Sequence, residues 1–303
     1  MLQNHVNYIA QTNKPSFLMN VPFSLSGDIP NNIWMQELSQ KERIINHDKA
    51  LLQFMELYSF LARHAFIYLL PSYPGLQDQT YVANLGIVLP HIEEPTVVIS
   101  NYRSEPRRGE SDIGREFFKQ MNFTVKDAPP YFEGEADLKH IKDNIYIGAY
   151  GIRTSKEALD WFNEFFDMRV IPFQISNEYF YHLDCCVLPL SSECVALCTE
   201  IAEPSTVKEL EKYVDIYDVS FSDTYMGLTN SIRCGNYLLC ASDLDELSPS
   251  SKYYEPEKSK IKSLNQLCSS LSIEPVYFNL SEFYKSGALL SCLIMHLNRN
   301  NFT

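Results

Sequence analysis

The chain has 303 residues, of which 45% are hydrophobic and 13% aromatic, and it carries a formal net charge of −13 at pH 7. This length and apolar content suffice for a large hydrophobic core, either as two ordinary domains or as one large closed fold. The acidic balance, without a basic stripe, excludes a general nucleic-acid binder and is compatible with a small cationic substrate.

The N-terminal stretch, residues 1–17, lacks a charged segment followed by an apolar one, so we expect no secretory signal. No apolar run is long enough to span a membrane, and the expected location is cytoplasmic. The chain contains eight cysteines and no CxxC pair, which favours reduced thiols over a disulfide framework. A zinc site formed by Cys194, Cys198 and a neighbouring histidine is a weaker alternative.

Hydrophobic periodicity and turn residues predict short groups of strands that alternate with five helices. The predicted helices cover residues 41–64, 112–121, 154–166, 204–213 and 257–271. The predicted strands cover residues 17–23, 66–70, 80–89, 96–100, 145–150, 169–175, 185–190, 236–241, 274–278 and 289–297. Thr154 and Glu157 form a capping-box pattern at the start of the third helix. Because no Gly-rich phosphate loop is present, a nucleotide-binding doubly wound sheet is disfavoured, and a closed or radial α/β arrangement fits as well.

The run Phe180–Asp184 contains a histidine and an aspartate two residues apart. Read as a strand, it places His182 and Asp184 on one face, with Tyr181 and Leu183 on the other. A charged group within an apolar run is unfavourable unless it is paired or functional. For this pair alone, a histidine satisfied by an incidental carboxylate is the simpler interpretation.

Other segments supply further candidates for a site. Cys292, near the C-terminus, is either a thiolate nucleophile with His182 as its acid–base partner or a buried structural cysteine. The run FEGEAD, Phe132–Asp137, gathers three carboxyl groups around Gly134, unless it is a solvated turn. Asn84 is either an inward polar group in an apolar strand or a turn residue.

Four arginines lie close to predicted helix starts. Arg103, Arg107 and Arg108 either serve a site or pair with the glutamates of the same charged connection. Arg153 directly precedes the third predicted helix, where backbone N–H groups also favour an anion.

Together these stretches resemble the guanidino-group-modifying enzymes, which include arginine deiminases, arginine dihydrolases, dimethylarginine hydrolases and amidinotransferases. The likeness is greatest to the arginine dihydrolase branch, covers nearly the whole chain and keeps the order of the motifs. The matching runs are NNIWM (31–35), QDQTYVANLG (77–86), YRSEPRRGE (102–110), FEGEAD (132–137), GAYGIRT (148–154), FYHLD (180–184) and SEFYKSGALLSC (281–292). The resemblance implies a five-bladed α/β propeller of ββαβ units (pentein-type), with residues 1–303 as a single catalytic domain and the site at its centre.

Carried over position by position, the resemblance implies that Cys292 is the nucleophile and His182 the general acid–base. Glu133 matches the family glutamate that contacts the guanidinium and the catalytic histidine. Asp184 matches a carboxylate that binds guanidinium nitrogens. Asn84 stands where deiminases carry an aspartate, and in this respect it is similar to the dihydrolases.

Three further positions imply contacts with the rest of the substrate. Asn32 resembles a substrate-side asparagine of the dihydrolases. Arg103 and Arg153 resemble the pair that holds the substrate α-carboxylate, in keeping with the bidentate geometry of arginine–carboxylate pairs.

Two segments depart from the family pattern. Ala136 stands where glycine is usual before the aspartate of FEGEAD. Leu289, Leu290 and Ser291 precede Cys292 where the family typically has small residues, a further glycine and a lysine. These changes could reshape the pocket wall or weaken activation of the thiolate.

The activity that the resemblance implies is hydrolysis of the guanidino group of arginine through a Cys-linked amidino intermediate, giving ornithine, ammonia and carbon dioxide. A neutral amide at Asn84 accepts a neutral ureido intermediate with less penalty than a carboxylate, which favours two hydrolyses over one. Arginine deiminase, amidinotransferase and a catalytically impaired guanidine-binding protein remain alternatives. The reaction needs no metal or organic cofactor, and the expected partner is a small-molecule substrate, neither nucleic acid nor membrane.

Overall fold

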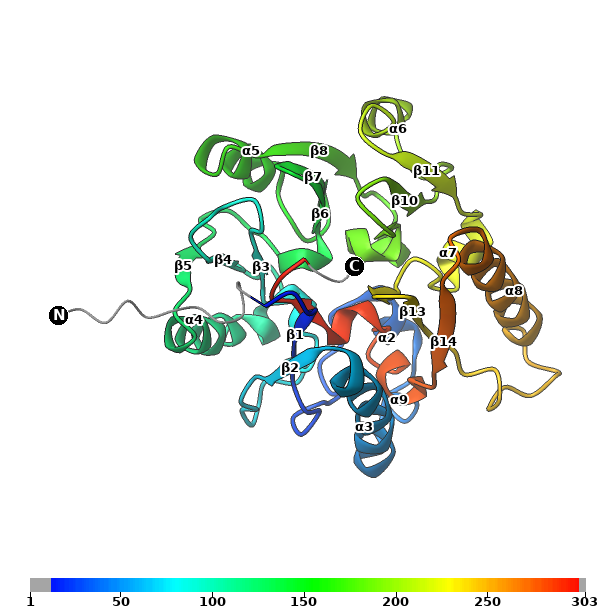
Figure 1. Ribbon diagram of the computed structural model, residues 1–303. Helices are drawn as coiled ribbons and strands as arrows, with labels where there is room; N and C mark the ends of the chain where they lie inside the picture. The colour runs from blue at the N-terminus through cyan, green and yellow to red at the C-terminus, as the bar shows by residue number, and fades with distance from the viewer. Residues whose placement is uncertain (1–11, 300–303) are drawn as a thin grey trace.

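The computed structural model describes residues 12–299, which form five three-stranded sheets arranged radially about a central axis (Figure 1). The predicted absence of a secretory signal concerns residues 1–17, of which residues 1–11 lie outside the described part. Written from the inner to the outer strand, the sheets are β15 (Met295–His296), β1 (Ser16–Met19) and β2 (Phe66–Leu69); β3 (Gly86–Val88), β4 (Thr96–Ile99) and β5 (Thr124–Asp127); β6 (Leu138–Lys142), β7 (Ile145–Tyr150) and β8 (Arg169–Gln174); β9 (Val187–Pro189), β10 (Cys194–Leu197) and β11 (Asp215–Asp218); and β12 (Ile232–Cys234), β13 (Tyr237–Ala241) and β14 (Glu274–Phe278).

Each sheet repeats one connection pattern. The inner strand runs antiparallel to the middle strand, and the middle strand pairs in parallel with the outer strand. A parallel pair needs a long crossover, which a helix supplies. The five crossover helices are α3 (His47–His64), α4 (Glu110–Gln120), α5 (Lys156–Phe165), α6 (Pro204–Leu210) and α8 (Tyr254–Ser270). They correspond to the five predicted helices and lie at the periphery of the ring, so the predicted propeller of ββαβ units is confirmed.

The sequence explains the longest of these helices. The Asn46 side chain caps α3 by accepting a hydrogen bond from the Lys49 N–H at 3.1 Å. Phe54, Leu57 and Leu61 recur at helical spacing and are buried against the sheet. The first blade closes the ring, because the early strand β1 pairs with the late strand β15.

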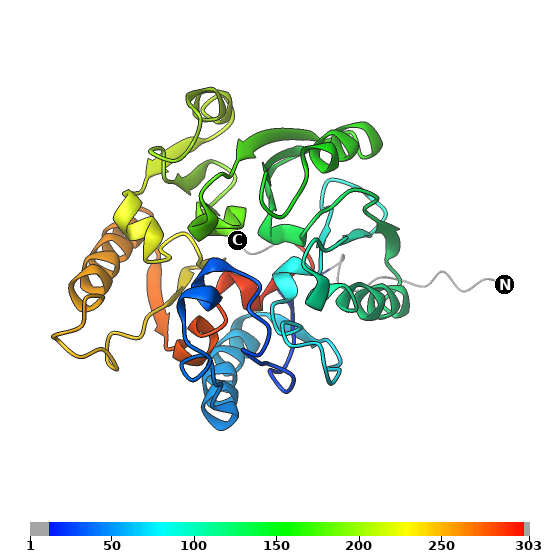
Figure 2. The same cartoon turned by 180° about the vertical axis from the view of Figure 1, so that it is seen from behind.

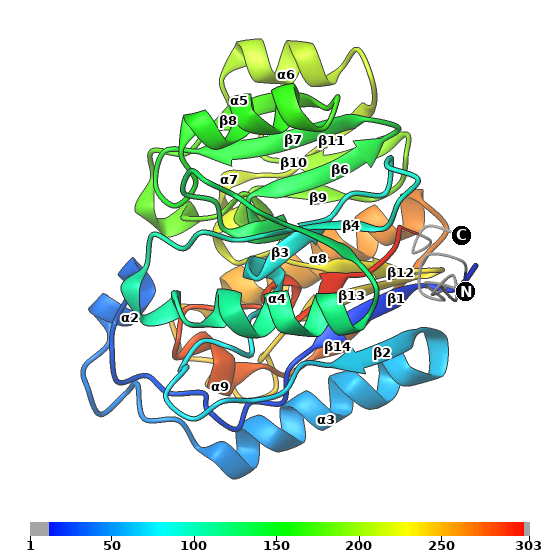
Figure 3. The same ribbon diagram turned by 90° about the vertical axis from the view of Figure 1, so that its left-hand side faces the viewer.

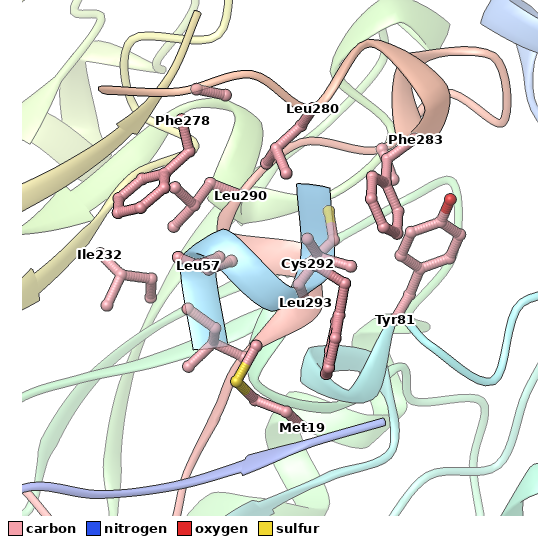
Figure 4. Packing of buried hydrophobic residues seen from close by; sticks show 14 of the residues in the cluster. Met19, Leu57, Tyr81, Ile232, Phe278, Leu280, Phe283, Leu290, Cys292 and Leu293 are labelled. Carbon is pink, nitrogen blue, oxygen red and sulfur yellow. The ribbon is translucent and has the colours of Figure 1, made fainter. Parts of the chain in front are cut away.

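Apolar side chains fill the spaces between neighbouring blades. The middle strands β1 and β4 are buried along their whole length, as expected for strands that are covered on both faces. Figure 4 shows one of the apolar clusters, in which Cys292 packs with Leu57, Tyr81 and Leu293. The predicted nucleophile therefore has an apolar environment on one side.

Three short helices lie between blades and position the site: α2 (Ile33–Glu37), α7 (Phe221–Tyr225) and α9 (Ser281–Tyr284). Figure 3 shows α2 and α9 at one end of the ring, and the view from behind shows α2 close to the centre (Figure 2). We call this end the front.

Three of the predicted strands contain turns instead. Asn84 ends a 3₁₀ turn at Val82–Asn84, Asp184 lies in one at Leu183–Cys185, and Cys292 lies in one at Ser291–Leu293. Within these turns, short backbone bonds such as Cys186 N–H to Leu183 C=O at 2.8 Å satisfy polar groups that a sheet would otherwise have to pair. The apolar character of these runs reflects burial, which strands and buried turns share.

The capping-box prediction at Thr154 is also wrong. Ser155 is the N-cap of α5, and the Thr154 hydroxyl instead donates to Asp137 Oδ2 at 2.6 Å and accepts from the Glu133 N–H at 3.1 Å. Thr154 therefore ties two segments of the site together.

All eight cysteines are free thiols. Among residues 12–299, no group of three or more His, Cys, Asp or Glu side chains is placed to hold a metal ion, so the zinc alternative at Cys194 and Cys198 gains no support. In the same part of the chain, no helix combines the length and apolar character needed to cross a membrane.

Candidate active site

Each of the five inner strands is preceded by a turn that carries polar side chains. At the front of the propeller, these turns supply Asn84 before β3, Glu133 before β6, His182 and Asp184 before β9, Asn230 before β12 and Cys292 before β15. Glycine makes one of the turns possible, since Gly134 has a φ of +69° and a Cβ there would lie 2.5 Å from the Ala83 carbonyl oxygen. The repeated architecture thus gathers residues from all five blades into one place.

His182 and Glu133 form the first half of this cluster. His182 Nε2 lies 2.9 Å from Glu133 Oε2 and 3.2 Å from Asn84 Nδ2, and all three side chains are buried. Arg153 Nη1 donates to the same Glu133 oxygen at 3.2 Å. Burial opposes ionisation of Glu133, but Arg153 and His182 outweigh it and hold the pKa of this carboxyl well below its usual range. Glu133 is therefore a carboxylate that orients the imidazole.

Asp184 and Cys292 form the second half. Asp184 Oδ2 accepts a hydrogen bond from Ser291 Oγ at 2.7 Å and lies 3.7 Å from Cys292 Sγ. Asn230 Nδ2 lies 3.7 Å from the same sulfur, and Asn230 Oδ1 accepts from the Ser291 N–H at 2.9 Å. The thiol is thus placed between a carboxylate and an amide.

The environment of Cys292 favours the protonated thiol. Burial is the main cause, and the charge of Asp184 adds to it, so that the pKa of Cys292 rises to about 12. A cation held by Asp184 would remove part of this effect. The sequence predicts that Asp184 binds such a cation, a guanidinium.

Two cavities meet at Cys292. The first, which we call the front cavity, is lined by Asn84, His182 and Cys292 together with Asn32, Asp78, Tyr81, Arg107 and Arg153, and has a volume of about 20 Å³. The second, which we call the aromatic chamber, has a volume of about 370 Å³ and reaches from Cys292 to Trp34, Tyr179 and Tyr225. Tyr181, Ala288 and Cys292 line both cavities and form their common wall.

Asn32, the predicted substrate-side asparagine, lies in the wall of the front cavity. As the N-cap of α2, its Oδ1 accepts from the Met35 N–H at 3.0 Å, and its Nδ2 donates to the Ser286 carbonyl at 3.0 Å. Gly287 has a φ of +76°, and a Cβ there would lie 2.5 Å from Asn32 Oδ1. The side chain of Asn32 is therefore held by α2 on one side and by the segment before Cys292 on the other.

The two predicted carboxylate-binding arginines lie in different environments. Arg153 lines the front cavity and stacks on the ring of Tyr181. Arg103 is exposed and does not line the cavity, because its guanidinium packs over Tyr131 and its Nε donates to the Arg153 carbonyl at 3.4 Å. The structure therefore brings Arg103 next to the backbone of Arg153 but does not place both guanidinium groups in one cavity.

The three carboxyl groups of FEGEAD have separate partners. Glu133 faces the front cluster, whereas Glu135 contacts His296 Nδ1 at 2.5 Å on the far side of the turn. Burial opposes ionisation of Glu135, but His296 and Arg299 lower its pKa to about 2. Asp137 Oδ1 accepts from the Leu183 N–H at 3.1 Å, and burial raises the pKa of Asp137 to about 6. Only one of the three carboxyl groups thus contacts His182.

Some residues of the site were missed by the sequence analysis. Asn230 contacts Cys292, and Asp78 and Arg107 line the front cavity. Arg107 is buried and donates to both Glu110 carboxylate oxygens, at 2.9 and 2.7 Å. Asn230 lies directly before the inner strand β12, as Asn84 and Cys292 lie directly before β3 and β15. This shared position would have identified Asn230 if strand β12 had been predicted.

The unusual residues before Cys292 have defined places. Ser291 donates to Asp184, and Leu290 is part of the apolar cluster behind the thiol. Leu289 lines the aromatic chamber and packs so closely on Gly227 that a Cβ at Gly227 would lie 2.1 Å from Leu289 Cδ1. Leu289 therefore shapes the chamber wall, as the sequence analysis anticipated for this segment.

No family model matches the chain. Among curated proteins, it is 31% identical over 186 residues to the bifunctional arginine dihydrolase/ornithine cyclodeaminase AgrE of Nostoc sp., covering 60% of this chain and 25% of AgrE. It is 29% identical over 177 residues to the bifunctional enzyme ArgZ of Synechocystis sp., covering 57% and 24% of the two chains. It is 23% identical over 226 residues to the N(G),N(G)-dimethylarginine dimethylaminohydrolase of Mycobacterium tuberculosis, covering 74% and 67%. The matches thus span about a quarter of the length of AgrE and ArgZ.

Solved structures share the fold. The complex of AgrE with ornithine and NAD+ superposes with a TM-score of 0.81 at 23% identity, over 94% of this chain and 39% of AgrE. The product-bound N-terminal domain of ArgZ gives 0.81 at 22% identity, over 94% and 98%. The DDAH of Pseudomonas aeruginosa gives 0.70 at 15% identity, over 93% and 99%.

The fold is therefore the five-unit α/β propeller of the guanidino-group-modifying enzymes. The predicted resemblance of this chain to that superfamily, near its arginine dihydrolase branch, is confirmed by relatives that hydrolyse guanidino C–N bonds.

Proposed function

We propose that this chain is an arginine dihydrolase, which hydrolyses the guanidino group of arginine to ornithine, two ammonia molecules and carbon dioxide. One observation carries the proposal: Asn84, His182 and Cys292, from three different turns, line the front cavity, and Glu133 and Asp184 contact His182 and Cys292 respectively. The relatives AgrE and ArgZ, whose names include arginine dihydrolase, support the choice of substrate. We further propose that residues 1–303 form one catalytic domain.

In the proposed first step, the guanidinium group binds beside Asp184 and Cys292. Its positive charge offsets the carboxylate, which lowers the pKa of the thiol and favours the thiolate. The thiolate attacks the central carbon, and the tetrahedral adduct expels ammonia after one nitrogen is protonated through His182. The product of this step is an amidino thioether on Cys292.

In the proposed second step, His182 takes a proton from water, which attacks the thioether carbon and releases the sulfur. Arginine yields a ureido group, that of citrulline, at this point. The same two steps on the ureido carbon expel a second ammonia and leave a carbamate, which decomposes to ornithine and carbon dioxide. Two water molecules are consumed per arginine, so the atoms balance.

The side chain of Asn84 favours two successive hydrolyses over a single hydrolysis that stops at citrulline. Its amide lies 3.2 Å from His182 Nε2 and offers both a donor and an acceptor to a neutral ureido group. A carboxylate at this position would favour the cationic starting group and would repel the ureido oxygen. A deiminase would stop at citrulline, and an amidinotransferase would pass the amidino group to an amine instead of water.

The front cavity has room for about one water molecule, which is less than a guanidino group needs. The aromatic chamber behind the common wall has a volume typical of small-ligand sites. We therefore propose that substrate binding moves the wall formed by Tyr181 and Ala288. At present the Tyr181 hydroxyl donates to the Gly287 carbonyl at 2.7 Å and holds this wall closed.

The proposal is tested by incubating the protein with L-arginine and quantifying ornithine, citrulline and ammonia. We expect ornithine and ammonia in a ratio of one to two, and slow consumption of added citrulline. Asn84→Asp should shift the product toward citrulline, whereas Asn236→Asp, in an exposed turn, should leave the ratio unchanged.

Release of citrulline alone by the native protein would establish the deiminase alternative. Formation of ornithine only when an acceptor amine is present would establish the amidinotransferase. Binding of arginine without any product would establish the guanidine-binding alternative.

A further inference from the structure

A second polar cavity lies among the inner strands and shares no lining residue with the front cavity. Its polar lining comes from β6, β12, β15 and the residues beside them: Lys139, Thr229, Ser231, Arg233, His296 and Arg299. Its volume is about 20 Å³, enough for one water-sized species. We call it the rear cavity. None of these side chains takes part in the proposed reaction.

Lys139 is the unusual residue of this group. Its side chain belongs to the inner strand β6 and the residue is only 5% exposed. A buried ammonium group ordinarily has a partner of opposite charge. Within residues 12–299 the ammonium group of Lys139 forms no hydrogen bond and no ion pair. Its charge is felt nearby, since it helps to lower the pKa of both Glu135 and Cys292.

The carboxylate closest to this cavity is already engaged. Glu135 contacts His296 Nδ1 at 2.5 Å and Arg299 Nη2 at 3.5 Å, and it also accepts from the His296 N–H at 3.0 Å. Arg299 Nη2 is buried and, within the described residues 12–299, has the longer ion pair but no hydrogen bond. Burial lowers the pKa of His296, although the charge of Glu135 opposes this shift. Among residues 12–299, Lys139 and Arg299 against Glu135 leave an excess of one positive charge.

We propose that the rear cavity binds a small monatomic anion, of the class of chloride, through Lys139 and the neighbouring arginines. The excess positive charge selects an anion, and the volume selects one no larger than a water-sized species. A tetrahedral oxyanion such as sulfate is too large for this space without displacement of its walls. The proposal does not depend on the activity proposed for the front cavity.

Size selectivity provides the test. Thermal unfolding of the native protein is measured in sodium chloride, sodium bromide and sodium sulfate at equal ionic strength, which separates binding from general screening. Sulfate raises Tm by exclusion from the protein surface, so the halide shift is compared between the native protein and Lys139→Met. It should be larger by about 2 °C or more in the native protein, as for any ligand that binds only the folded state. Crystals grown with bromide should show an anomalous scattering peak between Lys139 and Arg299.

Lys139→Met keeps the length of the side chain and removes its charge. It should abolish both the halide-specific shift and the bromide peak, whereas Lys126→Met, on the exposed edge strand β5, should preserve both. Equal shifts in all three salts together with no bromide peak in the native protein would overturn the proposal. A bromide peak that persists in Lys139→Met would also overturn it. Should Lys139→Met fail to fold, the native bromide peak alone decides.

Discussion

The front and rear ends of the propeller axis each contain a buried charged side chain that lacks an ion-pair partner among residues 12–299. At the front it is Asp184, which is fully buried and whose contacts are the neutral groups of Ser291, Cys292 and Cys185. At the rear it is Lys139, whose ammonium group has no hydrogen-bond partner among residues 12–299. Isolated buried charges are costly, so each is expected where a ligand of opposite charge binds.

The difference between the two ends follows from the chain direction of the inner strands. Each strand begins at the front, directly after a turn, and the turns carry Glu133 and Asp184. Two basic residues of the rear cavity lie within inner strands, Lys139 in β6 and Arg233 in β12. Neighbouring residues of one segment thus contact opposite ends of the axis. Glu133 contacts His182 at the front, and Glu135 contacts His296 at the rear. The front is suited to a guanidinium and the rear to an anion.

The largest effect is expected at the nucleophile of the front end. Cys292→Ser should reduce arginine turnover about 10³-fold or more, because a hydroxyl is far less ionised than a thiol and is a weaker nucleophile. Steady-state kinetics measures the loss, and mass spectrometry should detect an adduct with a reactive amidine only in the native protein. Cys240→Ser, remote from the front cavity, serves as the control. Full activity in Cys292→Ser would refute the covalent mechanism.

Glu133→Gln should disrupt the paired half of the front end. It leaves the buried guanidinium of Arg153 without its carboxylate, and removal of one partner of a buried pair costs about 3–5 kcal/mol. Turnover should fall about 100-fold, because His182 loses the group that orients it. Urea unfolding and kinetics measure the two effects. Exposed Glu105→Gln is the control, and an unchanged unfolding free energy would contradict the role of the pair.

The same variant should change the response to acid. Since the pKa of Glu133 is lower in the folded protein than in the unfolded chain, its contribution to stability is complete above the unfolded pKa of about 4.3. That contribution is lost as the pH falls toward the folded pKa. Unfolding free energies measured between pH 6 and pH 3 should therefore decline less steeply in Glu133→Gln than in the native protein.

The fold was predictable because its signals are local or repeated. The helical spacing of Phe54, Leu57 and Leu61 identifies α3, and the ordered motifs identify the propeller. The strands of the fourth blade were mostly missed, because β10 and β11 have four residues each and lack a clear alternation. Short strands in a blade obtain their stability from neighbours that are distant in the sequence.

The candidate site was predictable in many of its residues but not in its geometry. Cys292 and His182 were identified by resemblance and placed on strands, and Asn84 was placed either on a strand or in a turn, because buried turns and buried strands share an apolar composition. Asn230 has no distinctive local motif, and only the pairing of β12 places it at the thiol. Whether Glu135 or Glu133 faces His182 likewise depends on the φ of Gly134.

Asp184→Asn should separate thiol reactivity from turnover. Because the charge of Asp184 contributes to the raised pKa of Cys292, its removal should lower that pKa and speed alkylation of Cys292 by iodoacetamide about tenfold at pH 8, which corresponds to about one pKa unit. Turnover of arginine should fall, since the guanidinium loses its carboxylate. Asp160→Asn, exposed on α5, is the control. Parallel losses of alkylation and turnover would show that Asp184 only supports the local structure.

The smallest effect is expected from a substitution of Arg103. It tests whether the substrate-binding site at the front end extends as far as this residue. Arg103 is exposed but lies beside the backbone of Arg153, so a modest movement of its side chain would bring its guanidinium toward the α-carboxylate of a bound arginine. Arg103→Ala should raise KM for arginine about tenfold, equivalent to about 1.4 kcal/mol, and leave KM for agmatine unchanged, because agmatine lacks the carboxylate. Arg153→Ala should impair turnover of both substrates, because it also removes the partner of Glu133.

Steady-state kinetics with the two substrates measures the contrast, and Arg108→Ala, exposed in the same connection, is the matched control. Equal losses on arginine and agmatine in Arg103→Ala would mean that the residue stabilises the segment around Tyr131 and does not contact the substrate.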